Sequence, residues 1–295
     1  MLNKAPIFVN GFQRGGTTLL MNLLASHPGV CRPDGETHEV LYGRPSEPIK
    51  KWVKRFFSLP VVITTRQLIL WPKHLNERNA IPRFAMHYID WQLYWSKLTA
   101  PVNRSRNGCA ARSLRDIARA RLLCKNVNGV VLGTDLFRAM YPDATFVALV
   151  RNGLALCEAF VRRGWTAVDF AIMYERVCQK IIRDAERVDN YHVVRFEDMM
   201  RAPTAFIQEV YALASLDVGA VKRFRLRAKP SMDSGGVRKT TFGGADGEVR
   251  GFGLDEIEGV LRKDVNENQI ARLAEQDRQT FLKHAGRSMA TFGYG

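Results

Sequence analysis

The sequence predicts an α/β protein built on a central parallel sheet with helices on both faces. Short apolar runs rich in β-branched residues alternate with helical patterns along the chain. A glycine-rich turn follows the first run and opens a helix, as in P-loop-like three-layer folds. No run reaches the roughly 18 uncharged apolar residues that a membrane-spanning helix needs. These observations favour a folded α/β domain.

Four apolar runs are expected to form buried strands, because parallel strands covered on both faces read as continuous apolar stretches. They cover residues 6–10, 121–125, 144–150 and 191–196. Helical patterns follow the first, third and fourth runs, at residues 17–27, 154–165 and 205–215. We expect one long amphipathic helix from Glu267 to Met289.

Residues 45–110 interrupt this alternation. They are rich in aromatic side chains, and we interpret them as a mostly helical insertion of a single domain spanning residues 1–295. Core packing explains many of these aromatics, but binding pockets are also lined by such groups. The insertion is therefore the candidate acceptor-binding region.

The charge balance indicates the class of partner, and the cysteines indicate the cellular compartment. The chain has 44 Lys and Arg against 29 Asp and Glu, a net charge of +15, which favours anionic partners. It has five cysteines and no Cys-x-x-Cys spacing, which indicates reduced thiols. The start of the chain shows no signal-peptide pattern. We therefore expect a cytoplasmic protein.

The stretch GFQRGGTT, residues 11–18, carries the strongest chemical signal. Gly11 and Gly16 have the spacing of an NTP-binding loop, but Thr17 stands where that loop has lysine. Arg14 supplies a cation three positions earlier. Glycines allow a close backbone approach, and the helix that follows directs N–H groups and a partial positive charge into the loop. The pattern indicates an anion site that works without the usual lysine.

Basic residues also accompany the other expected strands. Lys125, Arg151 and Arg195 lie at the carboxyl ends of the second, third and fourth runs. Ligands of open parallel sheets bind beyond the carboxyl ends of the strands. Together with Arg14, these residues predict a pocket for a multiply charged anion.

The glycine loop resembles the 5′-phosphosulfate loop of sulfotransferases that use 3′-phosphoadenosine 5′-phosphosulfate (PAPS). Members of that family read PRSGTT there; Gln13 and Gly15 differ, and the other four residues match. Residues 125–165 resemble the family's lysine strand and 3′-phosphate segment, residues 191–203 its VRYEDL segment, and MATFGYG its ending. The resemblance implies a PAPS-dependent sulfotransferase with PAP as product and no metal.

The resemblance also implies donor-binding residues. At the 5′ end they are Arg14, Gly15, Gly16, Thr17 and Thr18. Arg151 matches the arginine that holds the 3′-phosphate, while Ala159 stands where the family has serine and removes one expected contact. Arg238 and Lys239, in the glycine-flanked stretch SGGVRKTTFGG, are candidates for a basic loop that closes over the 3′-phosphate.

A sulfuryl transfer needs a general base for the acceptor hydroxyl or amine. Glu36, in PDGETHEV, matches the glutamate base of tyrosylprotein members, with His38 and Glu39 as alternatives. Lys125 is expected to stabilise charge on the leaving group, and Arg14 to assist at the sulfuryl group. The acceptor itself is open: a small molecule, glycan, lipid or peptide, and an acidic one if two basic clusters at 103–125 and 222–229 are functional.

Two other functions fit parts of the sequence. A P-loop kinase or NTPase is disfavoured by Thr17 at the lysine position. A non-catalytic protein that binds PAP or an acidic ligand is favoured by the two departures from the family pattern, Gly15 and Ala159. The basic clusters are also explained as solvated faces, and no nucleic-acid-binding motif surrounds them.

Overall fold

A computed structural model describes residues 2–43, 52, 83–104, 112–232, 238–242, 247–261 and 265–294. Its central parallel sheet has five strands in the order β2-β3-β1-β4-β5, with helices flanking it. The strands are β1 (Ile7–Gly11), β2 (Val30–Cys31), β3 (Arg121–Val127), β4 (Thr145–Val150) and β5 (Tyr191–Arg195). Every residue of β1 and β4 is buried, as the apolar runs predict. The predicted fold class is confirmed, although the two-residue strand β2 was not predicted.

By residue contacts the chain divides into two compact units. The first unit comprises Met1–Asn10 and Pro28–Phe146, and the second comprises Gly11–His27 and Val147–Gly295. The prediction of one domain over residues 1–295 stays a prediction.

The first unit carries short helices around one long one. They are α2 (Thr37–Tyr42), α4 (Arg83–Thr99), α5 (Pro101–Arg104), α6 (Leu114–Arg119), α7 (Thr134–Met140) and a 3₁₀ helix at Asn128–Gly133. Helices α4 and α5 agree with the predicted helical insertion at 45–110. Residues 45–51, 53–82 and 105–110 of that prediction lie outside the described residues, and its role in acceptor binding stays a prediction.

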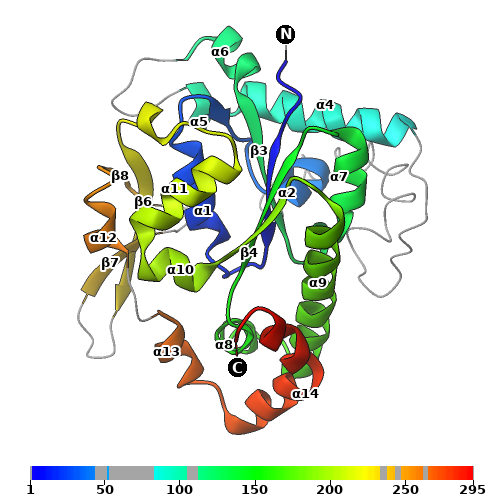
Figure 1. The fold of residues 1–295 in the computed structure, drawn as a ribbon, viewed down its shortest axis with the longest axis vertical. Coiled ribbons are helices and arrows are strands. Elements are labelled where there is room, and N and C mark those ends of the chain that lie inside the picture. The colour runs from blue at the N-terminus through cyan, green and yellow to red at the C-terminus, as the bar shows by residue number, and fades with distance from the viewer. Residues whose placement is uncertain are drawn as a thin grey trace. The chain divides into compact units, whose positions relative to one another are not determined.

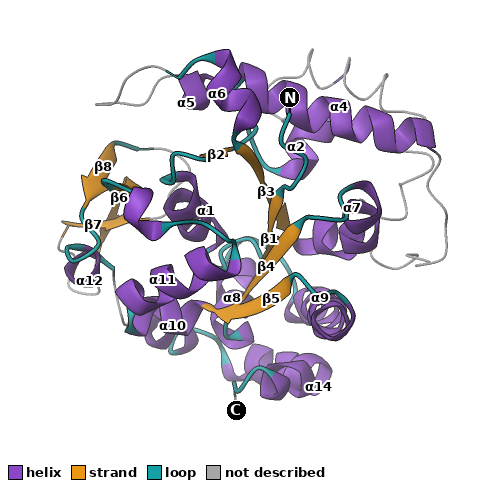
Figure 2. Cartoon of the chain, turned by 45° about the horizontal axis from the view of Figure 1, so that its top comes forward, coloured by secondary structure: helices purple, strands orange, loops and turns teal. Residues whose placement is uncertain are grey.

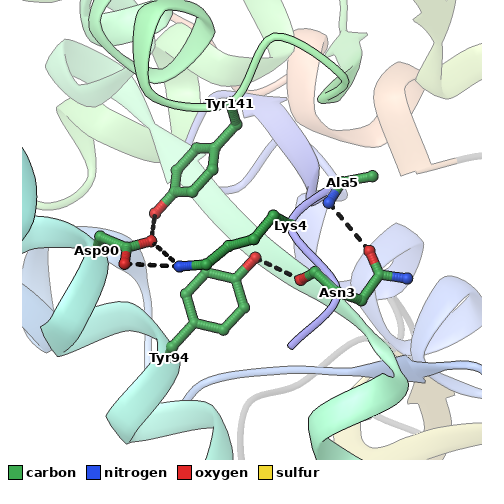
Figure 3. Close-up of polar contacts among 6 residues, drawn as sticks. All are labelled: Asn3, Lys4, Ala5, Asp90, Tyr94 and Tyr141. Carbon is green, nitrogen blue, oxygen red and sulfur yellow. Dashed lines mark hydrogen bonds and ion pairs between the residues drawn. The ribbon is translucent and has the colours of Figure 1, made fainter. Parts of the chain in front are cut away.

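Helix α4 is anchored through one face. Lys4 Nζ lies 2.5 and 2.6 Å from the two carboxylate oxygens of Asp90 and 4.0 Å from the centre of the Tyr94 ring. The Tyr141 hydroxyl donates to the same carboxylate at 2.8 Å, so three segments meet at Asp90 (Figure 3). Trp91 and Trp95, on another side of the helix, are more than half exposed. The helix thus has a firmly held face and an aromatic outer face.

The second unit is mostly helical. Its helices are α1 (Thr17–Ala25), α8 (Gly153–Val161), α9 (Ala167–Arg187), α10 (Phe196–Arg201), α11 (Pro203–Leu213), α12 (Ile257–Val260), α13 (Val265–Ile270) and α14 (Glu275–Thr291), with a 3₁₀ turn at Val218–Ala220. Helices α9 and α14 run side by side (Figure 1). Phe281 of α14 packs on Phe170 and Tyr174 of α9, with ring centres 5.8 and 5.3 Å apart. These aromatics explain why both helices are amphipathic.

The prediction of one helix from Glu267 to Met289 is wrong. The chain forms α13 and α14 with a turn at residues 271–274 between them. The half-buried residues Asn266, Gln269 and Ile270 of α13 have helical spacing, as do the buried residues Phe281, Ala285 and Met289 of α14, so a helical period stands on both sides of the break. Periodicity alone therefore does not reveal the turn.

A second sheet, antiparallel and in the order β7-β6-β8, was not predicted (Figure 2). Its strands are β6 (Phe224–Met232), β7 (Arg238–Phe242) and β8 (Val249–Phe252). The basic cluster at 222–229 largely forms β6, in which Phe224 and Leu226 are buried and Arg225 and Arg227 are half-buried. This alternation is the period-2 signal of a strand with one covered face. This alternation is present in the sequence, but its arginines and lysines led to the interpretation of the stretch as a basic cluster.

The prediction of a loop around Arg238 and Lys239 is also partly wrong. Both residues lie in β7, paired with Met232 and Ser231 of β6. Their side chains lie outside the described part of the structure. A strand forms here because Thr240, Thr241 and Phe242 have high β propensity.

Four cysteines of the described ranges are buried: Cys31, Cys124, Cys157 and Cys178. Cys109 lies outside these ranges. None of the helices in the described segments is long and apolar enough to cross a membrane.

Candidate functional site

The glycine loop is a strained turn between β1 and α1. Arg14 adopts the left-handed region at φ 64°, and its side chain is exposed. Gly16, the residue before α1, has φ 87°. A Cβ on Gly16 would lie 2.4 Å from the ring of Phe196, so both conformation and space require glycine there. Strain of this kind concentrates at functional sites.

The loop closes on itself through the carbonyl of Phe12. The backbone N–H of Gly15 donates to that oxygen at 3.1 Å, and the Thr17 hydroxyl donates to it at 3.3 Å. Thr17 is buried and Thr18 is half-buried. Helix α1 begins at Thr17 as predicted, so the N–H groups of its first turn are directed into the loop. A helix start of this kind can bind an anion, and that this loop does so stays a prediction.

Arg151 is buried in the second unit and holds this loop. Its Nη1 donates to the backbone oxygen of Arg14 at 2.6 Å, and its Nε donates to Oδ1 of Asn266 at 2.7 Å. Its Nη2 donates to Oε1 of Gln269. The guanidinium lies 4.3 Å from the centre of the Phe196 ring. Burial lowers the pKa of Arg151 to about 10, although Glu197 acts in the opposite direction.

Glu197 links the surroundings of Arg151 to the end of the chain. Its Oε1 accepts from the backbone N–H of Asn152 at 3.0 Å and from the amide of Asn266. Its Oε2 accepts from the hydroxyl of Tyr294. Burial, followed by the charge of Glu197, raises the pKa of Tyr294. The two segments that resemble RYED and LGY in the sequence therefore meet at Glu197.

Glu36 and Lys125, 89 positions apart in the chain, form an ion pair in the first unit. Lys125 Nζ lies 2.6 Å from Oε1 of Glu36, and both side chains are mostly buried. Oε2 of Glu36 is buried and receives no hydrogen bond from the described residues. The nearest basic group recorded for it is Nδ1 of His38, at 3.5 Å. Glu36 thus keeps one acceptor oxygen available while the other is held.

The two alternative bases differ in their surroundings. The carboxylate of Glu39 accepts the backbone N–H of Glu36 at 3.0 Å, which ties it to the start of α2. His38 is about one-third exposed and directs Nδ1 toward Glu36. Lys125 lies within β3, which continues to Val127, so the prediction that it ends its strand is wrong.

A buried polar chain supports this pair, and sequence reasoning missed it. Thr37 Oγ1 donates to Oδ1 of Asn126 at 2.6 Å, and the amide of Asn126 donates to Oδ1 of Asn10 at 3.1 Å. The amide of Asn10 donates to Thr134 Oγ1 at 3.2 Å. Thr37 and Asn126 follow Glu36 and Lys125 directly in the chain. Asparagines in otherwise apolar strands were the available signal, since buried amides need partners.

The structure says less about the remaining residues that were predicted to bind the donor. Ala159 is buried in α8 and offers no polar group. Arg14 and Arg151 meet in the second unit, and Glu36 and Lys125 meet in the first. That all four form one pocket with Arg195 stays a prediction. In the described ranges no three His, Cys, Asp or Glu side chains gather as a metal site.

Comparison with known proteins finds solved structures of similar fold. A search of curated proteins finds no match. Among solved structures, the sulfotransferase domain of the Synechococcus PCC 7002 olefin synthase has a TM-score of 0.52 at 16% identity, covering 99% of this chain and 97% of that one. The sulfotransferase domain from the curacin biosynthetic pathway has a TM-score of 0.51 at 12% identity, covering 100% and 99%. At such low identities, the likeness shows a shared fold.

The family model gives the stronger result. It describes the sulfotransferase family and matches residues 6–219, well over half of the chain. The matched range includes the glycine loop, Glu36, Lys125 and Arg151. The chain therefore belongs to the sulfotransferase family.

Proposed function

We propose that this protein transfers a sulfuryl group from PAPS to an acceptor hydroxyl or amine, with Glu36 as the general base. The observation that carries the proposal is the pair of Glu36 and Lys125, joined at 2.6 Å, in which Oε2 of Glu36 receives no hydrogen bond from the part of the chain that the structure describes. A carboxylate held by one oxygen and open at the other can accept a proton in a defined direction. Two of the three residues predicted to be catalytic, Glu36 and Lys125, thus contact each other directly.

The glycine loop fits the 5′ end of the donor. Its backbone turns at Arg14 and Gly16, and a Cβ on Gly15 would lie 3.0 Å from the Phe12 oxygen. The helix start, the Thr18 hydroxyl and the exposed Arg14 side chain supply donors and one full charge. PAPS supplies a sulfuryl group on a phosphate leaving group. In this proposal the loop holds that phosphosulfate.

Arg151 fits the 3′-phosphate. It is a buried cation whose recorded hydrogen bonds all go to uncharged oxygens. A buried charge without a direct counter-ion is costly, and an anion relieves that cost. Arg238 and Lys239 remain further candidates for this phosphate. Ala159 offers it nothing, so the affinity there rests on arginine.

The chemistry assigns one proton and one bond exchange. Glu36 Oε2 takes the proton of the acceptor O–H or N–H as the acceptor atom bonds to sulfur. The bond from sulfur to the bridging oxygen breaks, and its electron pair leaves with the phosphate of PAP. Lys125 stabilises the charge that develops on that oxygen, with Arg14 at the sulfuryl group. This requires the Glu36–Lys125 pair to reach the group held by the loop, without a metal ion.

Thermal shift with PAP tests donor binding. We expect PAP in the presence of EDTA to stabilise the fold by about 2.7 kcal/mol at a hundredfold excess over its Kd. Arg14→Ala and Arg151→Lys should reduce the shift strongly. Arg201→Ala is the matched control, because Arg201 is exposed and, within the described ranges, pairs with Asp198 of the same helix. No shift with PAP at saturation would overturn the donor assignment.

Transfer itself needs a second assay. The protein is incubated with labelled PAPS and cell extract, and labelled products are identified by mass spectrometry. We expect label transfer that disappears in Glu36→Gln. A protein that binds PAP and transfers nothing would support the non-catalytic alternative. Stabilisation by ATP and Mg²⁺ in place of PAP would support the NTPase alternative.

A further inference from the structure

Arg151 lies among two carboxylates and two amides of α8, α10 and α13, yet within the described residues its hydrogen bonds go to neutral oxygens. Asn266 and Gln269 of α13 supply two of these oxygens, and the Arg14 backbone supplies the third. Asn266 and Gln269 are one turn apart on the helix, so both amides face the same way. This contact set uses three of the five guanidinium N–H donors.

Each of the two amides has a carboxylate on its other side. The nitrogen of Asn266 donates to Glu197 Oε1. The nitrogen of Gln269 lies 3.4 Å from Glu158 Oε2. Glu197 is also held by Asn152 and Tyr294, and Glu158 pairs with Arg162 and Arg272 at 3.1 and 3.3 Å. Both carboxylates therefore have other partners and do not need Arg151.

The arrangement is unusual in its choice of residues. Glutamate at position 269 has the same length as glutamine and would give Arg151 a direct ion pair. Buried guanidinium groups are normally paired with such a carboxylate. Here the amides orient the guanidinium without neutralising it, so its full charge is kept for another anion.

We propose that Asn266 and Gln269 are positioning residues that hold Arg151 apart from Glu197 and Glu158, and so reserve its charge for the 3′-phosphate of the donor. This inference rests on the proposed function and adds two residues, neither of which the sequence predicts. They set the preference for a nucleotide that carries a 3′-phosphate. Gln269 is the better target, because Asn266 is also bound to Glu197.

The test compares the affinities for PAP and 5′-AMP, which lacks the 3′-phosphate, by calorimetry. We expect Gln269→Glu to weaken PAP about tenfold to a hundredfold, the size of a lost charge-assisted bond, and to change 5′-AMP less than twofold. Gln279→Glu is the matched control. Gln279 lies on the exposed surface of α14, and its side chain bonds only Glu275 among the recorded contacts. It should leave both affinities unchanged.

The variant Gln269→Met separates the effect of charge at position 269 on PAP affinity from the effect of side-chain shape. Methionine fills similar space without an oxygen, so Arg151 stays uncompensated and we expect PAP affinity within about threefold of the original. Equal loss of PAP binding in Gln269→Glu and Gln269→Met would overturn the inference and show a purely structural role. Unchanged PAP binding in a folded Gln269→Glu would overturn it as well.

The original protein distinguishes this inference from the proposed function. If it does not bind PAP, or binds PAP and 5′-AMP equally, the donor assignment fails. If it prefers PAP and Gln269→Glu keeps that preference, only the role of Gln269 fails. Melting temperatures without nucleotide show that each variant is folded.

Discussion

The surroundings of Glu36 and of Arg151 differ in how completely their polar atoms are satisfied. Glu36 has one oxygen on Lys125 and a second, buried oxygen with no hydrogen bond from the described residues. Arg151 uses each of its three nitrogens in a hydrogen bond and rests on the Phe196 ring. An open acceptor suits a group that must take a proton. A cation held at all three nitrogens suits a group that must stay in place, and its two further N–H donors can bind an anion.

The largest effect is expected at the open oxygen. Glu36→Gln keeps the shape but removes the base, so kcat for sulfuryl transfer should fall by about 10²–10⁴-fold. PAP affinity should stay within twofold, because the change is not in the donor cradle. His38→Asn is the control, with a small effect expected. A large loss in His38→Asn with activity kept in Glu36→Gln would reverse the assignment of the base.

The next effect concerns the rigidity of the loop that Arg151 holds. Gly16→Ala should destabilise the protein by about 2–4 kcal/mol, because it adds strain at φ 87° and a clash with Phe196. Gly164 has the same φ and no heavy atom within 4 Å of an added Cβ. Gly164→Ala should therefore cost only about 1 kcal/mol.

Urea unfolding of both variants measures this difference. The loss in free energy of unfolding is expected to be larger for Gly16→Ala than for Gly164→Ala, and the difference between the two losses is the cost of the clash with Phe196. Equal destabilisation would show that the Phe196 ring moves aside and that the loop is less rigid than its packing suggests.

A third prediction contrasts Arg151 with another buried cation. Lys97 donates to the backbone oxygens of Ala118 and Ala120, at 3.2 and 2.8 Å, and burial lowers its pKa to about 8. Between about pH 8 and pH 10.5 the unfolded chain holds a proton that the folded protein has lost. Stability should therefore rise with pH in this window, by at most about 1.4 kcal/mol per pH unit.

Lys97→Met lacks this contribution. The difference in free energy of unfolding between the original protein and Lys97→Met should move in favour of the original from pH 7.5 to pH 10. Urea titrations at several pH values measure it. A difference that does not change with pH would mean that Lys97 keeps an ordinary pKa.

The smallest effect is expected at the outer layer of the Arg151 cluster. Tyr294→Phe removes the bond to Glu197 and should cost about 1–2 kcal/mol. Tyr88→Phe is the control, since its hydroxyl meets only Gln92 of the same helix among the recorded contacts, at 3.1 Å. Melting temperatures measure both. If Tyr294→Phe costs no more than Tyr88→Phe, the chain end does not stabilise the cluster.

The local parts of the fold could be predicted from the sequence. The apolar runs identified β1, β3, β4 and β5, because buried parallel strands need continuous apolar residues. The glycines and threonines identified the turn into α1. The antiparallel sheet was missed because arginines mask the alternation in β6. The α13–α14 turn was missed because helical spacing is present on both sides of it.

The candidate site could be predicted only in part. Glu36, Lys125, Arg14 and Arg151 carry types of side chain that a sulfuryl transfer needs, and the family resemblance pointed to each. Glu197, Asn266, Gln269 and the Asn10–Asn126 chain were missed. Their residue types are common on protein surfaces, so only burial and partners distinguish them.

By itself, the sequence determined the family, the parallel core and the glycine loop that opens α1. These follow from local rules: apolar runs, glycine conformations and the spacing of a short motif. The tertiary structure decided that Lys125 meets Glu36 and that Arg151 meets Asn266, 115 positions away. Such contacts depend on the order of strands and the packing of helices, because local propensity carries no information about partners far along the chain.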